Sequence, residues 1–448
     1  MSAVPFGQAL KFWLKLGFIS FGGPAGQIAI MHRELVEQKR WISERRFLHA
    51  LNYCMLLPGP EAQQLATYIG WLMHKTRGGI AAGVLFVLPS LFILIALSWV
   101  YLRYGQVSWV AGLFYGIKPA VAAIVLHAVW RIGSRTLRRP SQGPLLWAIA
   151  IGSFVSIAFL KIAFPWVVAA AAVAGALGGK WLPAQFGANA GHGPAQRSWG
   201  PALIDDTTPT PPHAVFRKAR LAAVLTVGAF LWLAPMALLI AAQGWDGTLT
   251  QMGWFFTKAA LLTFGGAYAV LPYVYQGAVE HFQWLTGAQM IDGLALGETT
   301  PGPLIMVVAF VGFVGGWTRQ VLGPDMLFLG AALAASVATW FTFLPSFLFI
   351  LAGGPLVEAT HGQLRFTAPL TAITAAVVGV IASLALFFIA HIAQKTGAPG
   401  LFGLQIDFAA LLLAGAAAAA LLRNKLGVIP VIALCALAGL ALRTAGWA

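Results

Sequence analysis

The sequence predicts an all-α polytopic membrane protein whose two homologous halves form an inverted-topology repeat with broken or re-entrant helices. Three observations lead to this fold class. The composition is too apolar for a water-soluble chain, several short segments recur at a fixed spacing, and two matched loops differ sharply in charge. A protein of this kind crosses the bilayer many times and is expected to bind its substrate near the middle of the membrane.

The composition is that of a chain surrounded by lipid. Charged residues make up 9% and hydrophobic residues 59% of the 448 residues, and the mean hydropathy is +0.80; in a soluble domain about a quarter of the residues are charged. The apolar runs are continuous, unlike the alternating segments of about ten residues in an outer-membrane barrel. Their length suits helices that cross a hydrocarbon core about 30 Å thick. Examples are 80–102, 144–160, 221–242 and 404–422.

Several functional classes lack their residues in this sequence. The two cysteines cannot form a disulfide framework, and no metal site or cofactor is expected. The phosphate-loop, H-E-x-x-H and G-x-S-x-G motifs are missing, so we expect neither an enzyme nor an ATP-driven pump. We attribute the net charge of +15 to basic loops beside a membrane and expect no nucleic-acid binding. Lys11 and Lys15 interrupt the first apolar stretch, so no cleavable signal peptide is expected.

Three separated motifs repeat in one register. A shift of 243 residues places FWLKLGFISFGG (12–23) on FFTKAALLTFGG (255–266). The same shift places Trp41 on Trp284 and the first Pro-Gly-Pro triplet on the second. Further on, LPSLFIL (88–94) matches LPSFLFI (344–350) after a relative insertion of 13 residues. This agreement indicates an internal duplication.

The duplication divides the chain into three parts. Residues 1–181 form the first repeat, and 217–448 form the second. Residues 182–216 are rich in Pro and Gly and are expected to form a flexible cytoplasmic linker. The stretch at about 217–243 has no partner in the first half. As an additional span it would reverse the orientation of the second repeat.

The matched loops indicate which side of the membrane each faces. The loop 32–46 holds five Lys or Arg residues, while its counterpart 275–289 holds none. Because cytoplasmic loops concentrate Lys and Arg, we expect 32–46 and the linker in the cytoplasm and 275–289 outside. Arg33 of the first loop is a candidate for attracting anions to the cytoplasmic mouth, although a role in topology alone accounts for most of these charges.

Two kinds of helix break recur in the halves, and they are candidates for the binding site. The Gly pairs Gly22-Gly23 and Gly265-Gly266 serve either as small packing residues or as breaks, and Pro24 favours a break after the first pair. The Pro-Gly-Pro triplets each separate two apolar stretches that are too short to span the membrane. These triplets are Pro58, Gly59 and Pro60, and Pro301, Gly302 and Pro303. Paired breaks in two halves of a transporter indicate its binding site.

Charged and polar residues around these breaks suggest an anion site. Lys15 and Lys258 each precede a Gly pair and either face an anion or extend to the membrane interface. Glu61 and Glu298 flank the triplets as proton-coupling candidates; the alternative is a structural acceptor. Uncharged groups that could bind the same ligand are Gln63, Gln64, Thr299 and Thr300.

Four segments together resemble the chromate ion transporter family, in its long two-domain bacterial form. They are FGGPAGQIAIMHRELVEQKRWISERRF, LLPGPEAQQLATYIGW, FTFGGAYAVLPYVYQ and GLALGETTPGPLIMVVAFVGF. The resemblance covers nearly the whole chain outside the linker. It assigns family motif positions to Phe21, Gly22, Gly23, Pro24, Pro58, Gly59, Pro60, Glu61, Phe264, Gly265, Gly266, Gly297, Glu298, Thr299, Pro301, Gly302 and Pro303. Ala267 stands where the first half has Pro24, so the two breaks need not share one geometry.

The resemblance implies export of chromate across the bacterial inner membrane, chromate resistance, about a dozen spans and sulfate as a related anion. With the cytoplasm negative, export of each negative charge gains roughly 2.3 kcal/mol per 100 mV, so the expected transporter needs no ATP. Uniport and proton exchange both stay open. The alternatives are an importer or exchanger of sulfate or another oxyanion, and an anion channel. The lipid bilayer is the expected surrounding, and a homodimer is one option for the oligomeric state.

Overall fold

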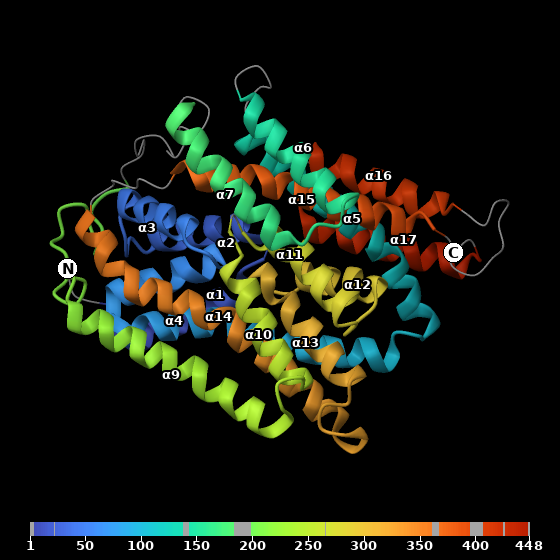
Figure 1. Ribbon diagram of the computed structural model, residues 1–448, viewed down its shortest axis with the longest axis horizontal. Helices are drawn as coiled ribbons and strands as arrows, with labels where there is room; N and C mark the ends of the chain where they lie inside the picture. The colour runs from blue at the N-terminus through green and yellow to red at the C-terminus, as the bar shows by residue number, and fades with distance from the viewer. Residues whose placement is uncertain are drawn as a thin grey trace.

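The computed structural model describes residues 4–21, 23–137, 143–182, 199–264, 266–360, 367–394, 406–423 and 426–446, and Figure 1 shows its helices. The described part contains no strand and is built from α-helices with a few short π-helical and 3-10 turns. The first half contains α1 (Phe6–Ile19), α2 (Gly23–His32), η1 (Arg33–Gln38), α3 (Glu44–Leu56), α4 (Glu61–Tyr104), α5 (Ser108–Thr136), α6 (Pro144–Ala158) and α7 (Phe164–Trp181). The second half contains α9 (Lys218–Gln243), α10 (Thr248–Leu261), α11 (Ala267–Tyr275), η2 (Gln276–His281), α12 (Gly287–Thr299), η3 (Leu304–Met306), α13 (Val307–Thr318), η4 (Pro324–Met326), α14 (Leu327–Thr360), α15 (Thr367–Ile392), α16 (Phe408–Leu422) and α17 (Val428–Thr444).

The length and apolar character of these helices make the chain a multi-pass membrane protein. Among the described residues, 5 helices are long and apolar enough to cross a bilayer: Glu61–Tyr104, Ser108–Thr136, Lys218–Gln243, Pro324–Glu358 and Ala368–Ile392. Shorter apolar helices accompany them, namely Pro144–Ala158, Leu304–Thr318, Phe408–Leu422 and Val428–Thr444. The all-α membrane fold predicted from composition is therefore confirmed.

The 44 residues of α4 do not form one straight span. His74 and Lys75 depart from helical geometry, and Lys75 has a φ of 60°. A Cβ on Gly83 would clash with the Thr67 hydroxyl, although 16 residues of straight helix would separate the two positions by about 24 Å. The chain therefore turns back on itself, so that 61–73 form a short helix beside the long segment 76–104. In the second half the corresponding pair is α13 and α14, which also pack together.

The two halves match element by element. Helices α3 and α12 and the π-helical turns η1 and η2 have the same bounds after the shift of 243. Ser43 caps α3 by accepting a hydrogen bond from an amide three residues on, and Thr286, its counterpart, caps α12 in the same way. Such caps satisfy one of the free N–H groups at a helix start.

The helices form two layers (Figure 1). One layer holds α1–α4 and α10–α14, and α9 lies along its outer side. The other holds α5, α6, α7, α15, α16 and α17. Within the second layer, α5 packs against α16 and α17, while α15 packs against α6 and α7. Helix α5 of the first half thus packs against α16 and α17 of the second half, and α15 of the second half packs against α6 and α7 of the first. This exchange is the pattern that a pseudo-twofold axis produces.

Part of the predicted linker is packed rather than free. Leu203 and Ile204 donate amide hydrogen bonds to Arg40 and Trp41 at 2.9 and 3.1 Å, and the Ser43 hydroxyl donates to the Asp206 carboxylate at 2.6 Å. The expectation of a flexible linker therefore does not hold for 199–216, because backbone pairing and side-chain contacts attach this segment to the first repeat. Residues 183–198 lie outside the described part.

Candidate functional site

The four helix breaks meet at the centre of the protein. Each Pro-Gly-Pro triplet contacts the Gly break of the opposite half: Gly59 donates its amide to the Thr263 carbonyl at 2.7 Å, and Gly302 donates to the Ser20 carbonyl at 2.8 Å. The shift of 243 relates these two hydrogen bonds to each other. The Gln27 side chain also donates to the Gly302 carbonyl. The breaks therefore satisfy one another's backbone groups, as irregular backbone at membrane depth requires.

The glycines at these breaks have conformations that other residues rarely adopt. Gly23, Gly59, Gly266 and Gly302 have φ angles of 68°, 125°, 96° and 108°. At Gly59 a Cβ would also lie 2.3 Å from the Ser346 hydroxyl oxygen, so the position needs glycine for space as well. Gly22 and Gly265 lie outside the described residues.

A cavity of about 600 Å³ leads from the surface to these breaks. It lies between the two layers of helices: α2, η1, α3 and the start of α4 form one wall, and α5 with Thr374 of α15 forms the other. Pro24, Glu61 and Gly266 contribute to its lining. The predicted broken helices are thus brought together at a solvent-accessible space.

A cluster of charged and hydroxyl groups surrounds the inner end of the cavity. Glu61 begins the helix after the first triplet, and its carboxylate would lie 3.9 Å from a Cβ on Gly266. The Tyr268 hydroxyl donates to the buried Glu298 carboxylate. The guanidinium of Arg131 lies 5.9 Å from the centre of the Tyr268 ring and interacts electrostatically with both glutamates. Glu61 and Glu298 come from different halves, and Tyr268, the hydrogen-bond partner of Glu298, lines the same cavity as Glu61 and Arg131.

The outer part of the cavity carries both signs of charge. His32 lies between two carboxylates, with its ring nitrogens 3.1 Å from Glu37 and 2.5 Å from Glu44. Arg135, one turn beyond Arg131 on α5, lines the opposite wall. The cavity therefore has Glu37 and Glu44 on one wall and Arg131 and Arg135 on the other.

The uncharged candidates lie beside the breaks and donate hydrogen bonds within the protein, while the buried side-chain oxygens of Gln63 and Gln64 have no hydrogen-bond partner. Gln63 donates to the Thr67 hydroxyl at 3.0 Å and Gln64 to the Pro58 carbonyl at 2.8 Å, and both side chains are fully buried. The hydroxyls of Thr299 and Thr300 donate to carbonyls one turn earlier in α12. These groups hold the breaks in shape, and none of them lines the cavity.

The structure does not place the two repeated lysines at the cavity. The Lys15 side chain is 59% exposed and pairs with Glu34 at 3.5 Å. Lys258 is exposed and lies over the Trp254 ring at 5.6 Å. Arg33 is exposed on η1 and lines no part of the cavity either. The register shared by the lysines thus reflects equivalent surface positions of α1 and α10, where long side chains can reach the interface.

The sequence interpretation did not single out Arg131 or Tyr268. Arg131 lies on α5, which carries none of the repeated motifs. Tyr268 was visible in principle, because it stands where the first half has Ala25. Such a departure between two otherwise matched breaks is the signal that could have identified it.

The pseudo-twofold symmetry fails at the cavity. Helix α12 packs against α5 and α17, whereas α3, its counterpart, has no comparable contact with α15 or α7 among the described helices. On the packed side Asp292 of α12 is buried, with its carboxylate 3.6 Å from Lys118 and 2.8 Å from the Tyr101 hydroxyl. The interface of α12 with α5 and α17 is therefore closed, whereas the equivalent interface of α3 is open at the cavity.

Comparison with known proteins identifies the family. The model of the chromate transporter family matches residues 7–176 and 250–440. This chain belongs to the chromate transporter family. A chromate transport protein of Pseudomonas aeruginosa is 34% identical over 96% of this chain and 91% of its own length. One of Cupriavidus metallidurans is 30% identical over 84% of this chain and 80% of its own, and a probable chromate transport protein of Synechococcus elongatus is 30% identical over 84% and 82%.

No solved structure matches the chain. The family assignment therefore rests on sequence, and it agrees with the all-α membrane fold and with the duplication, since the family model covers both halves. Homologues named as transport proteins place the chain among transporters.

Proposed function

We propose that this member of the chromate transporter family is a secondary transporter that exports chromate from the cytoplasm. The observation that carries the proposal is the cavity that is lined by Arg131 and Arg135 and reaches Pro24, Glu61 and Gly266 at three of the helix breaks. Arginine guanidinium groups bind tetrahedral oxyanions well because their planar donors match two oxygens at once. Relatives named as chromate transport proteins supply the choice of anion.

The breaks add favourable groups for an anion. Helices α2 and α11 begin at the glycine breaks, and helix starts present free N–H groups and the positive end of the helix dipole. Glu61 and Glu298 oppose a dianion when they are ionised, so proton uptake by either would favour anion binding. Proton uptake and anion binding would then favour each other, so these glutamates would couple chromate to protons that move in the same direction rather than in exchange.

The unequal interfaces support a carrier over a channel. A carrier exposes its site to one side at a time, commonly by rocking one group of helices against another. Here one interface is open at the cavity and its symmetry mate is closed around Asp292. The basic loop 32–46 borders the open side. If it lies in the cytoplasm of a bacterial inner membrane, the conformation accepts chromate from inside the cell.

Uptake of labelled chromate by inside-out vesicles tests the proposal. We expect saturable accumulation that increases with a potential positive inside the vesicle and that excess sulfate blocks only partly. Vesicles without the protein provide the background. Uptake that does not saturate would indicate a channel, and equal competition by sulfate would replace chromate with a broader oxyanion specificity. Accumulation only in right-side-out vesicles would reverse the direction.

A further inference from the structure

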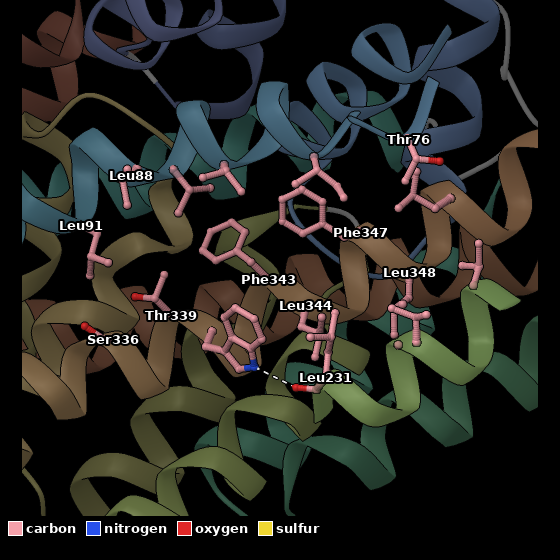
Figure 2. A pocket seen from close by; sticks show the side chains of 18 of the residues that line it. Thr76, Leu88, Leu91, Leu231, Ser336, Thr339, Phe343, Leu344, Phe347 and Leu348 are labelled. Atoms are coloured by element: carbon pink, nitrogen blue, oxygen red, sulfur yellow. Dashed lines mark hydrogen bonds between the residues drawn. The ribbon is translucent and has the colours of Figure 1, made fainter. Parts of the chain in front are cut away.

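A second cavity of about 620 Å³ lies between α4, α9 and α14, away from the anion path (Figure 2). Its walls are almost wholly apolar. The side chains that define it are Val84, Leu88, Val227, Phe343, Phe347 and Leu348. Val227 is 57% exposed, so the cavity is a groove that opens sideways toward the surrounding hydrocarbon.

The groove carries its charge at one end only. Arg220, in the first turn of α9, and Thr76 form this end, and the Arg220 guanidinium donates to the Thr76 hydroxyl at 3.3 Å. Lys75 is the neighbouring exposed residue of α4. Burial lowers the pKa of His213 in the adjoining segment, and the positive charges of Arg220 and Lys75 lower it further. Of these charged residues only Arg220 lines the groove, and its guanidinium also donates to the His213 carbonyl.

The opposite end offers no free polar group. Ser336 and Thr339 line it, but each donates its hydroxyl to a carbonyl one turn earlier in α14, at 2.8 Å. Figure 2 shows them beside Leu88 and Leu91, far along the groove from Thr76. A ligand that fits this groove is apolar over its length and has an anionic group at one end.

The dimensions suit one lipid chain. From Thr76 to Leu91 the groove follows 15 residues of α4, or about 22 Å of helix. One leaflet of the hydrocarbon core is about 15 Å deep, so a single acyl chain would lie along most of this length. The charged end belongs to the first turn of a membrane span, which is the depth at which a phosphate headgroup lies.

We infer that this groove is a binding site for one anionic phospholipid, with an acyl chain between α4, α9 and α14 and its phosphate at Arg220. The occupant also accounts for the position of α9, the helix that has no counterpart in the first repeat. Only 11% of the apolar window of α9 is buried inside the protein. A bound lipid would fill the space between α9 and its neighbours.

Native mass spectrometry of the full chain in detergent, with added phosphatidylglycerol or phosphatidylcholine, tests the inference. Val227→Trp fills the groove from an exposed position, and Leu225→Trp places the same ring on α9 at a residue that does not line it. We expect one phosphatidylglycerol on the wild type and on Leu225→Trp and at least a tenfold loss on Val227→Trp. Arg220→Gln is expected to remove the preference for phosphatidylglycerol over phosphatidylcholine, whereas Arg217→Gln keeps it.

Each contrary outcome overturns the inference. Equal occupancy in Val227→Trp and Leu225→Trp would place any bound lipid elsewhere on the surface. If the wild-type protein binds neither phospholipid, even in excess, the groove is not a specific phospholipid site and is filled by detergent or bulk lipid. An unchanged preference in Arg220→Gln would remove the headgroup assignment. Circular dichroism and size-exclusion profiles establish that the variants are folded before occupancy is compared.

Discussion

Replacement of Gly59 by alanine is the most direct test of the paired breaks. The Gly59 φ of 125° is a conformation that alanine rarely adopts, which costs about 1–3 kcal/mol. The new Cβ would also lie 2.3 Å from the Ser346 Oγ and 2.6 Å from the Gln64 amide nitrogen, and overpacking of this kind typically costs about 1–3 kcal/mol. Gly59→Ala should therefore destabilise the protein by about 2–6 kcal/mol in total.

Thermal unfolding in detergent, together with chromate uptake, measures this effect. We expect a midpoint several degrees below wild type and reduced transport. Gly302→Ala should behave alike, because its φ is 108° and a Cβ would lie 2.7 Å from Ser90. Adding Ser346→Gly to Gly59→Ala should recover the part of the steric loss that is due to Ser346, but neither the contact with Gln64 nor the part that is due to φ.

A neutral glycine provides the matched control. Gly415 lies within α16, and a Cβ added there would have no neighbouring atom within 4 Å, so Gly415→Ala should leave the midpoint unchanged or raise it slightly. A Gly59→Ala protein as stable and as active as Gly415→Ala would refute the argument, since neither the close contact nor the backbone conformation could then be real constraints.

Three further predictions concern charge. Arg131→Gln should reduce kcat/KM for chromate at least about tenfold with normal amounts of protein in the membrane, because a hydrogen bond to a charged group contributes about 1.5–3 kcal/mol; wild-type kinetics would remove Arg131 from the anion path. Lys15→Met and Lys258→Met should each leave the saturation curve close to wild type, as their side chains lie on the outer surface. Lys118→Met should lower the thermal midpoint by leaving Asp292 buried and unpaired, a loss of about 3–5 kcal/mol, and a second change, Asp292→Asn, should restore part of it.

Much of the fold could be predicted because its causes are local or periodic. The apolar composition requires a membrane, since no polar surface remains to face water. The register of 243 residues and the uneven charge of the matched loops predicted the inverted repeat. The structure agrees with the repeat, because helices α3 and α12 have equivalent bounds. The breaks were visible because proline and glycine interrupt helices through their own backbone chemistry.

The candidate site could be predicted only in part. Glu61, Glu298 and the glycines were found because they lie in the motifs themselves. Arg131 was missed because α5 reaches the site from another part of the chain, and no local pattern reveals which distant helix will pack there. The sequence left two alternatives for Lys15 and Lys258, because equal register in two halves shows equivalence but not which face of a helix turns inward.

By itself, the sequence determined that lipid surrounds the chain, that the chain is duplicated and where the helices break, because hydropathy, repetition and backbone chemistry are properties of short segments. Only the tertiary structure decided that each break contacts the break of the other half, that Arg131 and Tyr268 line the same cavity as Glu61, and that one interface is open while its symmetry mate is closed. These features depend on contacts between residues far apart in the chain. Such contacts are selected by packing, which no single segment encodes.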